Sequence, residues 1–141
     1  MFRHFAILAP LLLTSAPSAQ ALDILVTDQV IVKSGHDLFE HHCARCHGAD
    51  AAGATSNSGK ETIKAPSLLD LAKQSGGNLP IWGAYEVIDG SKVVVEHRNR
   101  AMPIWGEEFA KSRTITKENK DAIVRGRILA ILAYLSTMQE K

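Results

Sequence analysis

The sequence predicts a mostly helical protein with a single domain. The chain has 141 residues, close to one average domain, and 45% of them are hydrophobic. Its clearest segment, from Lys117 to Met138, has no proline and repeats apolar residues at helical spacing. Shorter helical segments precede it, separated by long loops, and few segments favour strands. Such scattered helices would fill a core poorly, so we expect something else to occupy the centre.

The composition excludes several classes of protein. The 16 Lys and Arg residues nearly balance the 15 Asp and Glu residues, and charged residues make up 22% of the chain. This excludes a disordered tail, a multi-pass membrane protein and a strongly basic nucleic-acid binder. We therefore expect no nucleic-acid partner. A nearly neutral chain also argues against long-range steering by net charge, although a local patch could still steer.

Residues 1–21 read as a secretory signal peptide. Arg3 gives a positive start, residues 5–13 form an apolar run, and Ala19-Gln20-Ala21 is an A-x-A cleavage pattern. The run is too short for a bilayer, which needs about 20 residues. We expect cleavage after Ala21 and export to the periplasm, with an uncleaved interfacial anchor as the alternative. Since no other long apolar run follows, no membrane span is expected in the mature protein.

Two segments precede the first motif. Residues 22–33 are rich in Ile, Leu and Val and are expected to form an N-terminal arm or a short strand. The domain itself is expected to span 34–141. Ser34 followed by Asp37 is a capping pattern, which predicts a helix that begins at Ser34 and continues to the first cysteine.

The middle of the chain is expected to alternate loops and short helices. Residues 48–59 are small and polar and predict a loop without core residues. One or two helical turns should follow Pro66, and a helix over 80–88 should stop at Asp89-Gly90. Residues 92–96 contain three consecutive valines and favour an extended segment.

The last helix carries a regular apolar stripe and must pack on the rest of the domain. The stripe consists of Val124, Ile128, Ile131, Leu135 and Met138, widened by Ile123, Ala130 and Tyr134.

The sequence Cys43-Ala44-Arg45-Cys46-His47 is a C-x-x-C-H motif, the pattern of haem c attachment. Two residues between the cysteines allow both sulfurs to reach the two vinyl groups on one porphyrin edge, where each forms a thioether bond. The adjacent His47 can then direct its imidazole at the iron. The motif thus predicts one covalently bound haem c.

Two other interpretations of the cysteines remain. A catalytic dithiol normally opens a helix after a strand, whereas Cys43 and Cys46 lie at the end of a predicted helix. A zinc site needs two further ligands, and His41, His42 and His47 are too clustered to provide them convincingly.

Met102 is the best candidate for the second axial ligand. It lies far enough from His47 along the chain to reach the other side of the iron, and Pro103 biases it toward an extended backbone. Trp105 and Gly106 then mark a loop. A thioether ligand favours iron(II) and raises the reduction potential. His97 is the main alternative ligand. Met102 could instead only fill space in the hydrophobic core, and an iron without a second protein ligand is the third possibility.

The order of these motifs resembles a class I cytochrome c of the small monohaem bacterial kind, over about residues 34–138. Four features carry the resemblance: Cys43 to Gly48 after a helix with Gly35 and Phe39, the segment Ala65-Pro66-Ser67-Leu68, the segment Met102-Pro103-Ile104-Trp105-Gly106, and a terminal helix with Ile131 and Tyr134. The resemblance implies a cytochrome c fold, with several helices wrapped around one covalently bound haem.

The family also implies roles for single residues. The carbonyl of Pro66 would accept a hydrogen bond from the imidazole of His47 and strengthen it as a donor. Gly35 and Phe39 would meet Ile131 and Tyr134 where the first and last helices cross.

Three features depart from the family pattern. The loop over residues 48–59 is long and rich in glycine and alanine, residues 93–100 lie outside the pattern, and Trp82 has no assigned role. His97, Arg98 and Arg100 could neutralise haem propionates or could belong to a solvated strand. If they neutralise propionates, replacing Arg100 with Gln should lower the reduction potential.

The resemblance implies an electron-transfer protein and not an enzyme. We expect a periplasmic one-electron carrier that accepts from a dehydrogenase or a quinol-oxidising complex and donates to an oxidase or a reductase. The first alternative is a haem c subunit held in a larger oxidoreductase complex, with the 22–33 arm as its partner-binding element. The second is an enzyme or ligand sensor with an open iron site.

Overall fold

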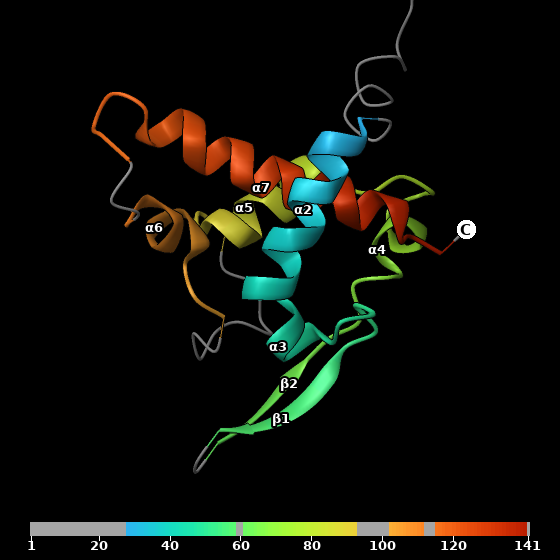
Figure 1. Cartoon of the computed structure of the whole chain (residues 1–141). Coiled ribbons are helices and arrows are strands. Elements are labelled where there is room, and N and C mark those ends of the chain that lie inside the picture. The colour runs from blue at the N-terminus through green and yellow to red at the C-terminus, as the bar shows by residue number, and fades with distance from the viewer. Residues whose placement is uncertain (1–27, 59–60, 93–101, 112–114, 141) are drawn as a thin grey trace, which may run out of the picture.

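The structure, a computed structural model, describes residues 28–58, 61–92, 102–111 and 115–140. Helices dominate this part of the chain, as predicted, and a single two-stranded sheet accompanies them. In chain order the elements are α2 (Gln29–His42), α3 (Ala44–His47), β1 (Ala54–Ser58), β2 (Glu61–Ala65), α4 (Leu71–Gln74), α5 (Ile81–Asp89), α6 (Trp105–Ala110) and α7 (Lys120–Thr137). Figure 1 shows α7 crossing α2, and the β1–β2 hairpin projecting beyond α3.

The crossing of α2 and α7 is a close backbone contact. A Cβ atom built on Gly35 would overlap the carbonyl oxygen of Ala130 and lie 2.6 Å from its carbonyl carbon. The rings of Phe39 and Tyr134 lie 5.5 Å apart, and Ile131 is 1% exposed. The contact that the resemblance implies between the first and last helices is therefore confirmed.

The core lies along α7, which packs on α2, α5 and α6. Four residues of the predicted stripe, Val124, Ile128, Ile131 and Leu135, are buried, and Met138 is half-buried. Leu132 and Ala133 are buried as well, outside the stripe. Because helices cover α7 on more than one side, its apolar surface is wider than a single stripe. The helix begins at Lys120, three residues later than predicted.

Helix α2 begins earlier than the sequence indicated. The side chain of Asp28 accepts hydrogen bonds from the backbone N–H groups of Val30, at 2.9 Å, and Ile31, at 3.3 Å. The prediction that Ser34 caps the helix is wrong, and residues 29–33, assigned to the arm, are helical. Asp28 supplies the same capping chemistry six residues earlier, and the Ile and Val side chains that follow are compatible with a helix.

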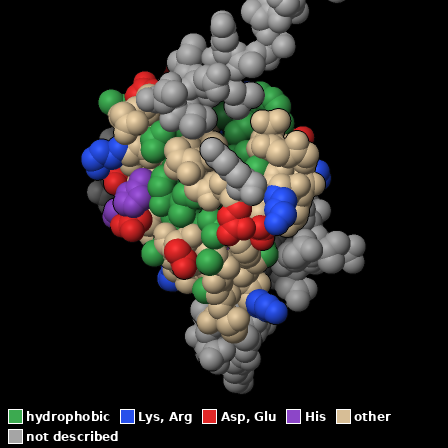
Figure 2. Space-filling view, turned by 90° about the vertical axis from the view of Figure 1, so that its right-hand side faces the viewer, with side chains coloured by type: hydrophobic (Ala, Val, Ile, Leu, Met, Phe, Trp, Pro, Cys, Tyr) green, Lys and Arg blue, Asp and Glu red, His purple; other side chains and the backbone are tan. Residues whose placement is uncertain are grey.

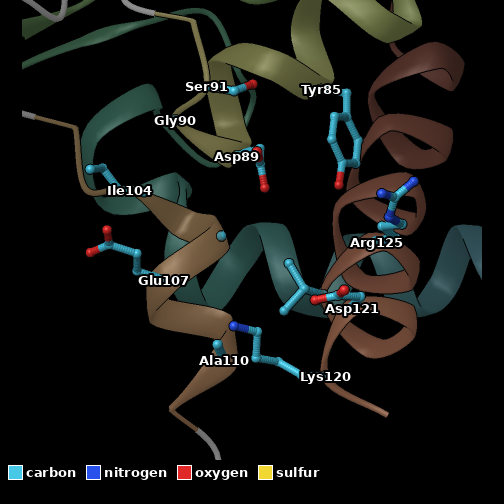
Figure 3. Close-up of a pocket in the computed structure, with 12 residues that line it drawn as sticks. Tyr85, Asp89, Gly90, Ser91, Ile104, Glu107, Ala110, Lys120, Asp121 and Arg125 are labelled. Carbon is cyan, nitrogen blue, oxygen red and sulfur yellow. The ribbon is translucent and has the colours of Figure 1, made fainter. Parts of the chain in front are cut away.

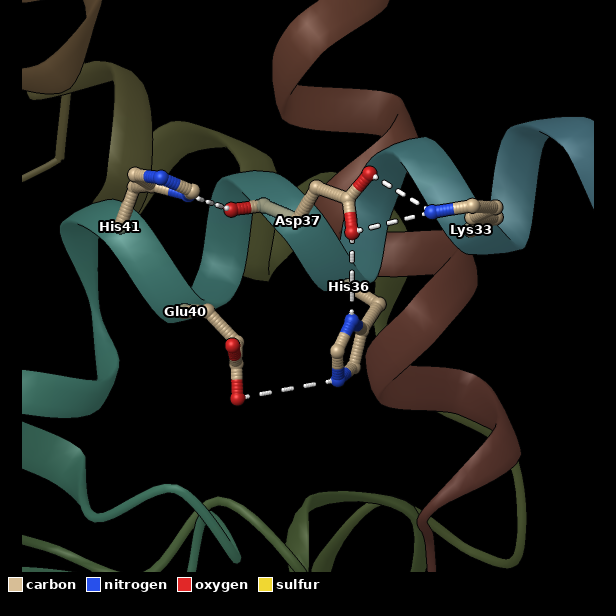
Figure 4. A network of polar contacts seen from close by, with 5 residues as sticks. All are labelled: Lys33, His36, Asp37, Glu40 and His41. Atoms are coloured by element: carbon tan, nitrogen blue, oxygen red, sulfur yellow. Dashed lines mark hydrogen bonds and ion pairs between the residues drawn. The ribbon is translucent and has the colours of Figure 1, made fainter.

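The exposed face of α2 carries a polar network (Figure 4). Lys33 Nζ lies 3.1 Å from Asp37 Oδ2, and this contact lowers the pKa of Asp37. His36 lies 3.4 Å from Asp37 Oδ1 and 3.8 Å from Glu40 Oε1, and His41 Nδ1 lies 2.6 Å from the carbonyl oxygen of Asp37. These groups are largely exposed, so we expect each to contribute little to stability.

The loop predicted over 48–59 is partly a strand. Residues 54–58 pair antiparallel with 61–65, in a register that runs from Ala54 opposite Ala65 to Ser58 opposite Glu61. Ala51 in the same segment is fully buried, so the prediction of a loop without core residues is wrong. The strand was missed because its sequence does not alternate apolar and polar residues; its partner strand, rather than periodicity, fixes its conformation.

The remaining helices show one agreement and one correction. Helix α5 ends at Asp89, and Gly90 caps it with φ of 93°, so the predicted stop is confirmed. Helix α4 provides the predicted short turn. Trp105 and Gly106 begin α6, so the predicted loop there is wrong, because burial of Phe109, 3% exposed, favours a helical turn. Most of the extended segment predicted over 92–96 lies outside the described residues.

The surface carries charges of both signs. On the face shown in Figure 2, apolar side chains lie among acidic, basic and histidine side chains. This agrees with the nearly neutral sequence. Within the described segments, every helix is too short or too polar to span a bilayer.

Candidate functional site

The C-x-x-C-H motif forms a tight helical turn directly after α2. Cys43 ends α2, and its carbonyl oxygen accepts hydrogen bonds from the N–H groups of Cys46, at 3.0 Å, and His47, at 2.9 Å. Helix α3 follows and ends at Gly48, whose φ is 81°. Residues three apart on a helical turn lie on the same side of the helix. Cys43 and Cys46 can therefore both contact the same edge of a bound group.

Both cysteines of the motif are half-buried. Both are free, with no disulfide between them. Burial, together with the neighbouring Cys46, raises the pKa of Cys43 to about 12. A catalytic dithiol needs a lowered pKa to supply its thiolate, so the dithiol interpretation is disfavoured. Within the described residues, no group of three or more His, Cys, Asp or Glu side chains could hold a metal ion.

His47 is fixed by one hydrogen bond. Its side chain is buried, and Nδ1 lies 3.0 Å from the carbonyl oxygen of Pro66. Because a carbonyl can only accept, Nδ1 carries the proton. Burial lowers the pKa of His47 more than the Pro66 contact raises it, so the imidazole is neutral at pH 7. Nε2 is then left with a free lone pair, which is the form that binds iron. The contact implied by the resemblance is present.

The loop that follows α3 holds Pro66 in place. The N–H of Gly53 donates to the carbonyl oxygen of His47 at 2.8 Å. Gly53 has φ of 87°, and a Cβ atom there would lie 2.7 Å from Ser67 N and 2.8 Å from Pro66 C. Gly53, just before β1, thus packs directly against the backbone of Pro66, whose carbonyl oxygen accepts the hydrogen bond from His47. The only local signal of this role in the sequence is a glycine in a polar stretch.

Met102 lies before α6, on a different segment. It is half-buried and packs against the same apolar cluster as Cys43. The ring of Trp105, three residues later, contacts His42 at 5.2 Å between centroids. The rival ligand His97, with Arg98 and Arg100, lies outside the described residues.

These residues fit a haem group. Cys43 and Cys46 offer two neighbouring thiols, His47 offers a fixed neutral imidazole, and Met102 offers a thioether sulfur. Half-buried apolar side chains from several segments accompany them, namely Leu68, Leu69, Leu79, Ile81, Ala84 and Trp105. A donor set with one imidazole, one thioether and two thiols, beside apolar side chains, suits a covalently bound macrocycle.

A separate cavity of about 680 Å³ lies between α5, α6 and α7 (Figure 3). Its charged lining comprises Asp89, Glu107, Lys120, Asp121 and Arg125. Partial burial and the nearby Asp89 raise the pKa of Tyr85, which also lines it. Cys43, Cys46, His47, Pro66 and Met102 are not among the residues that line this cavity, although Ile104 and Gly106 of the Met102 segment are. Trp82 is 68% exposed and contacts only the ring of Tyr85 among the described aromatic residues, at 5.8 Å.

Comparison with known families decides the class of protein. Residues 31–125, more than half of the chain, match the family model described as cytochrome C oxidase, cbb3-type, subunit III. The chain belongs to this family. No curated protein and no solved structure matches it significantly.

This c-type cytochrome domain has the predicted cytochrome c fold and takes a haem cofactor. Its function is haem-based electron transfer, and it is an electron-transfer protein rather than a catalytic enzyme. The matched residues include the motif, Pro66 and Met102. Membership of the family also indicates redox partners for the cytochrome domain.

Proposed function

We propose that this cytochrome carries one electron at a time in the periplasm. One haem c would be bound by two thioether bonds, to Cys43 and Cys46, and ligated by His47 and Met102. The observation that supports this best is the hydrogen bond from His47 Nδ1 to Pro66, which leaves a neutral Nε2 free for iron. The iron, when bound, supplies the redox centre, which alternates between its ferrous and ferric states.

The protein's own groups set the conditions for that redox centre. The Pro66 carbonyl orients the His47 ring and increases the basicity of Nε2. The sulfur of Met102, as a soft ligand, favours the ferrous state and raises the reduction potential. Apolar surroundings disfavour the extra positive charge of the ferric state and act in the same direction.

Export is part of the proposal. The positive start, the apolar run and the A-x-A pattern support removal of residues 1–21, with cleavage after Ala21. The donor would be a dehydrogenase or a quinol-oxidising complex, and the acceptor an oxidase or a reductase. Sequencing the N-terminus of protein from a periplasmic fraction should give Leu22 as the first residue.

A second candidate function is that of a haem c subunit held in a larger oxidoreductase complex. The family description, which names subunit III of a cbb3-type oxidase, favours it. Size exclusion of a native extract separates the two candidates. Elution at the size of a single small protein supports the free carrier, and co-elution with a larger enzyme supports the subunit.

The mass and the visible spectrum of the mature protein test the site. Where haem ligation is active, the polypeptide should be heavier by one haem, and the ferric form should show the sulfur-to-iron charge-transfer band. Met102→Ala should abolish the band and allow carbon monoxide to bind the ferrous form. A mass equal to the bare polypeptide would exclude covalent haem. Ready carbon monoxide binding by the unaltered protein would point to an open iron site.

A further inference from the structure

A cluster of three rings joins the end of α2 to α6. The ring centroid of His42 lies 5.2 Å from that of Trp105 and 5.1 Å from that of Phe109, both edge-to-face. Trp105 and Phe109 lie 5.4 Å apart. Such distances and angles are the favourable geometry of aromatic pairs, so the cluster is an attractive contact between two segments.

The two segments are those that carry the proposed axial ligands. His42 directly precedes Cys43, the first residue of the motif, and Trp105 follows Met102 by three residues. Three residues of chain reach at most about 10 Å, so Trp105 limits where Met102 can lie. Between His47 and Met102 the chain passes through the hairpin, α4 and α5. The position of Met102 relative to the motif is therefore set by contacts across the fold.

The ring cluster is held in place by contacts between Phe109 of α6 and Arg127 of α7. Phe109 is 3% exposed, and its carbonyl oxygen accepts a hydrogen bond from Arg127 Nη1 at 3.0 Å. The Arg127 guanidinium also lies 5.8 Å from the centre of the Phe109 ring. In the same segment, Ile104 packs so closely on Gly90 that a Cβ there would lie 2.6 Å from Ile104 Cγ2. The Met102 segment is thus also held against the end of α5.

We infer that the contact between His42 and Trp105 is a clamp that positions Met102 against the haem-binding motif. His42 is a positioning residue: it touches Trp105, and Trp105 fixes the segment that presents Met102. The inference rests on the proposed ligation by Met102. A loosened clamp would let the Met102 segment move away from a bound iron more often, and added ligands would then compete for that position.

Competition by added imidazole for the ferric iron measures this opening. In the holoprotein with His42→Ala, we expect imidazole to bind about tenfold more tightly, which corresponds to about 1.4 kcal/mol. His42→Phe keeps a ring at this position and should restore the affinity of the unaltered protein. Trp105→Phe keeps a smaller ring, so its affinity for imidazole should lie between those of the unaltered protein and His42→Ala. This variant replaces His42→Ala in the test if His42→Ala does not fold.

His36→Ala is the matched control. His36 lies on the same helix and also contacts an aromatic ring edge-to-face, that of Tyr134 at 5.0 Å. Tyr134 belongs to α7 and not to the Met102 segment. The control should therefore change the imidazole affinity less than twofold, even where its stability falls as much as that of His42→Ala.

The outcomes separate the clamp from the proposed ligation. If the unaltered ferric protein lacks the sulfur-to-iron band, ligation by Met102 is wrong and the clamp falls with it. If the band is present and His42→Ala and His36→Ala bind imidazole equally well, the clamp is wrong and the ligation stands. Hydrogen exchange of the backbone amides of 104–108 adds a readout independent of the iron. It should be faster in His42→Ala and unchanged in His36→Ala.

Discussion

Gln139 ties the end of the last helix to the segment that follows Pro66. Its Nε2 donates to the carbonyl oxygen of Leu68 at 2.9 Å, and to that of Leu135 at the same distance. Its Oε1 accepts from the N–H of Ala72 at 2.8 Å. One amide side chain thereby joins three backbone groups from two distant parts of the chain.

Gln139→Glu should destabilise the protein by about 2 kcal/mol. An ionised glutamate keeps the acceptor for Ala72 but loses both donors and faces two carbonyl oxygens. Chemical denaturation of the holoprotein gives the free energy of unfolding. Gln74→Glu, at an exposed position, makes the same chemical change and should cost less than about 0.5 kcal/mol. Equal costs for the two variants would show that the Gln139 contacts contribute nothing.

Gly35→Ala should destabilise the crossing of α2 and α7. The added methyl group would overlap the carbonyl of Ala130, so the two helices must separate, at a cost of about 1–3 kcal/mol. Gly126→Ala is the control, since a Cβ at this exposed position in α7 meets nothing within 4 Å. Because alanine is the better helix former, the control should gain up to about 1 kcal/mol. Thermal unfolding should thus shift in opposite directions in the two variants.

Gly53→Ala should raise the reduction potential as well as lower stability. A Cβ at Gly53 would push against Pro66 and weaken its hydrogen bond to His47. A less basic imidazole stabilises the ferric state less, and a loss of about 0.5–1 kcal/mol corresponds to about 20–40 mV. Redox titration measures the shift.

Gly76→Ala is the control that distinguishes displacement of Pro66 from backbone strain at a glycine with positive φ. Gly76 has a similar φ of 77° but meets nothing within 4 Å. It should lose about 1–2 kcal/mol of stability through strain, with an unchanged potential. A potential that moves equally in both variants would contradict the role of Gly53.

His42 should make the protein less stable in mild acid. Partial burial, with smaller effects of His41 and Arg127, lowers the pKa of His42 below its ordinary value of 6.5. The unfolded chain therefore binds a proton at a higher pH than the folded one. The contribution of His42 is complete above pH 6.5 and is lost as the pH falls through 6.5 to the lower folded pKa.

His42→Phe removes this titration and keeps a ring beside Trp105. Denaturation at several pH values between 5 and 8 should therefore show a smaller loss of stability on acidification in the variant. Parallel curves for the two proteins would mean that His42 titrates normally in the folded state.

Short-range chemistry was read correctly from the sequence. Gly90 stops α5 because a left-handed residue at a helix end favours glycine. Ile128 and Ile131 are buried because they repeat at helical spacing. Cys43 and His47 lie on one turn because only a few residues separate them. Each of these features depends on neighbours within a turn or two.

The secondary-structure predictions were wrong where contacts beyond the local sequence decide the conformation. Ser34 and Asp28 are equally good caps by sequence, and the helix takes the earlier one. Residues 54–58 become a strand only because 61–65 pair with them. Trp105 begins a helix because Phe109 finds a buried place against the other helices.

The sequence by itself determined which side chains are proposed to carry the haem chemistry, because the C-x-x-C-H spacing and the Met-Pro segment are local patterns. Only the tertiary structure decided how those side chains are held. The Pro66 carbonyl meets His47, Gly53 closes on Pro66, and His42 meets Trp105 through contacts between segments far apart in the chain. Such contacts form only when the whole chain packs. The family resemblance implied the first of them, and no local pattern records the other two.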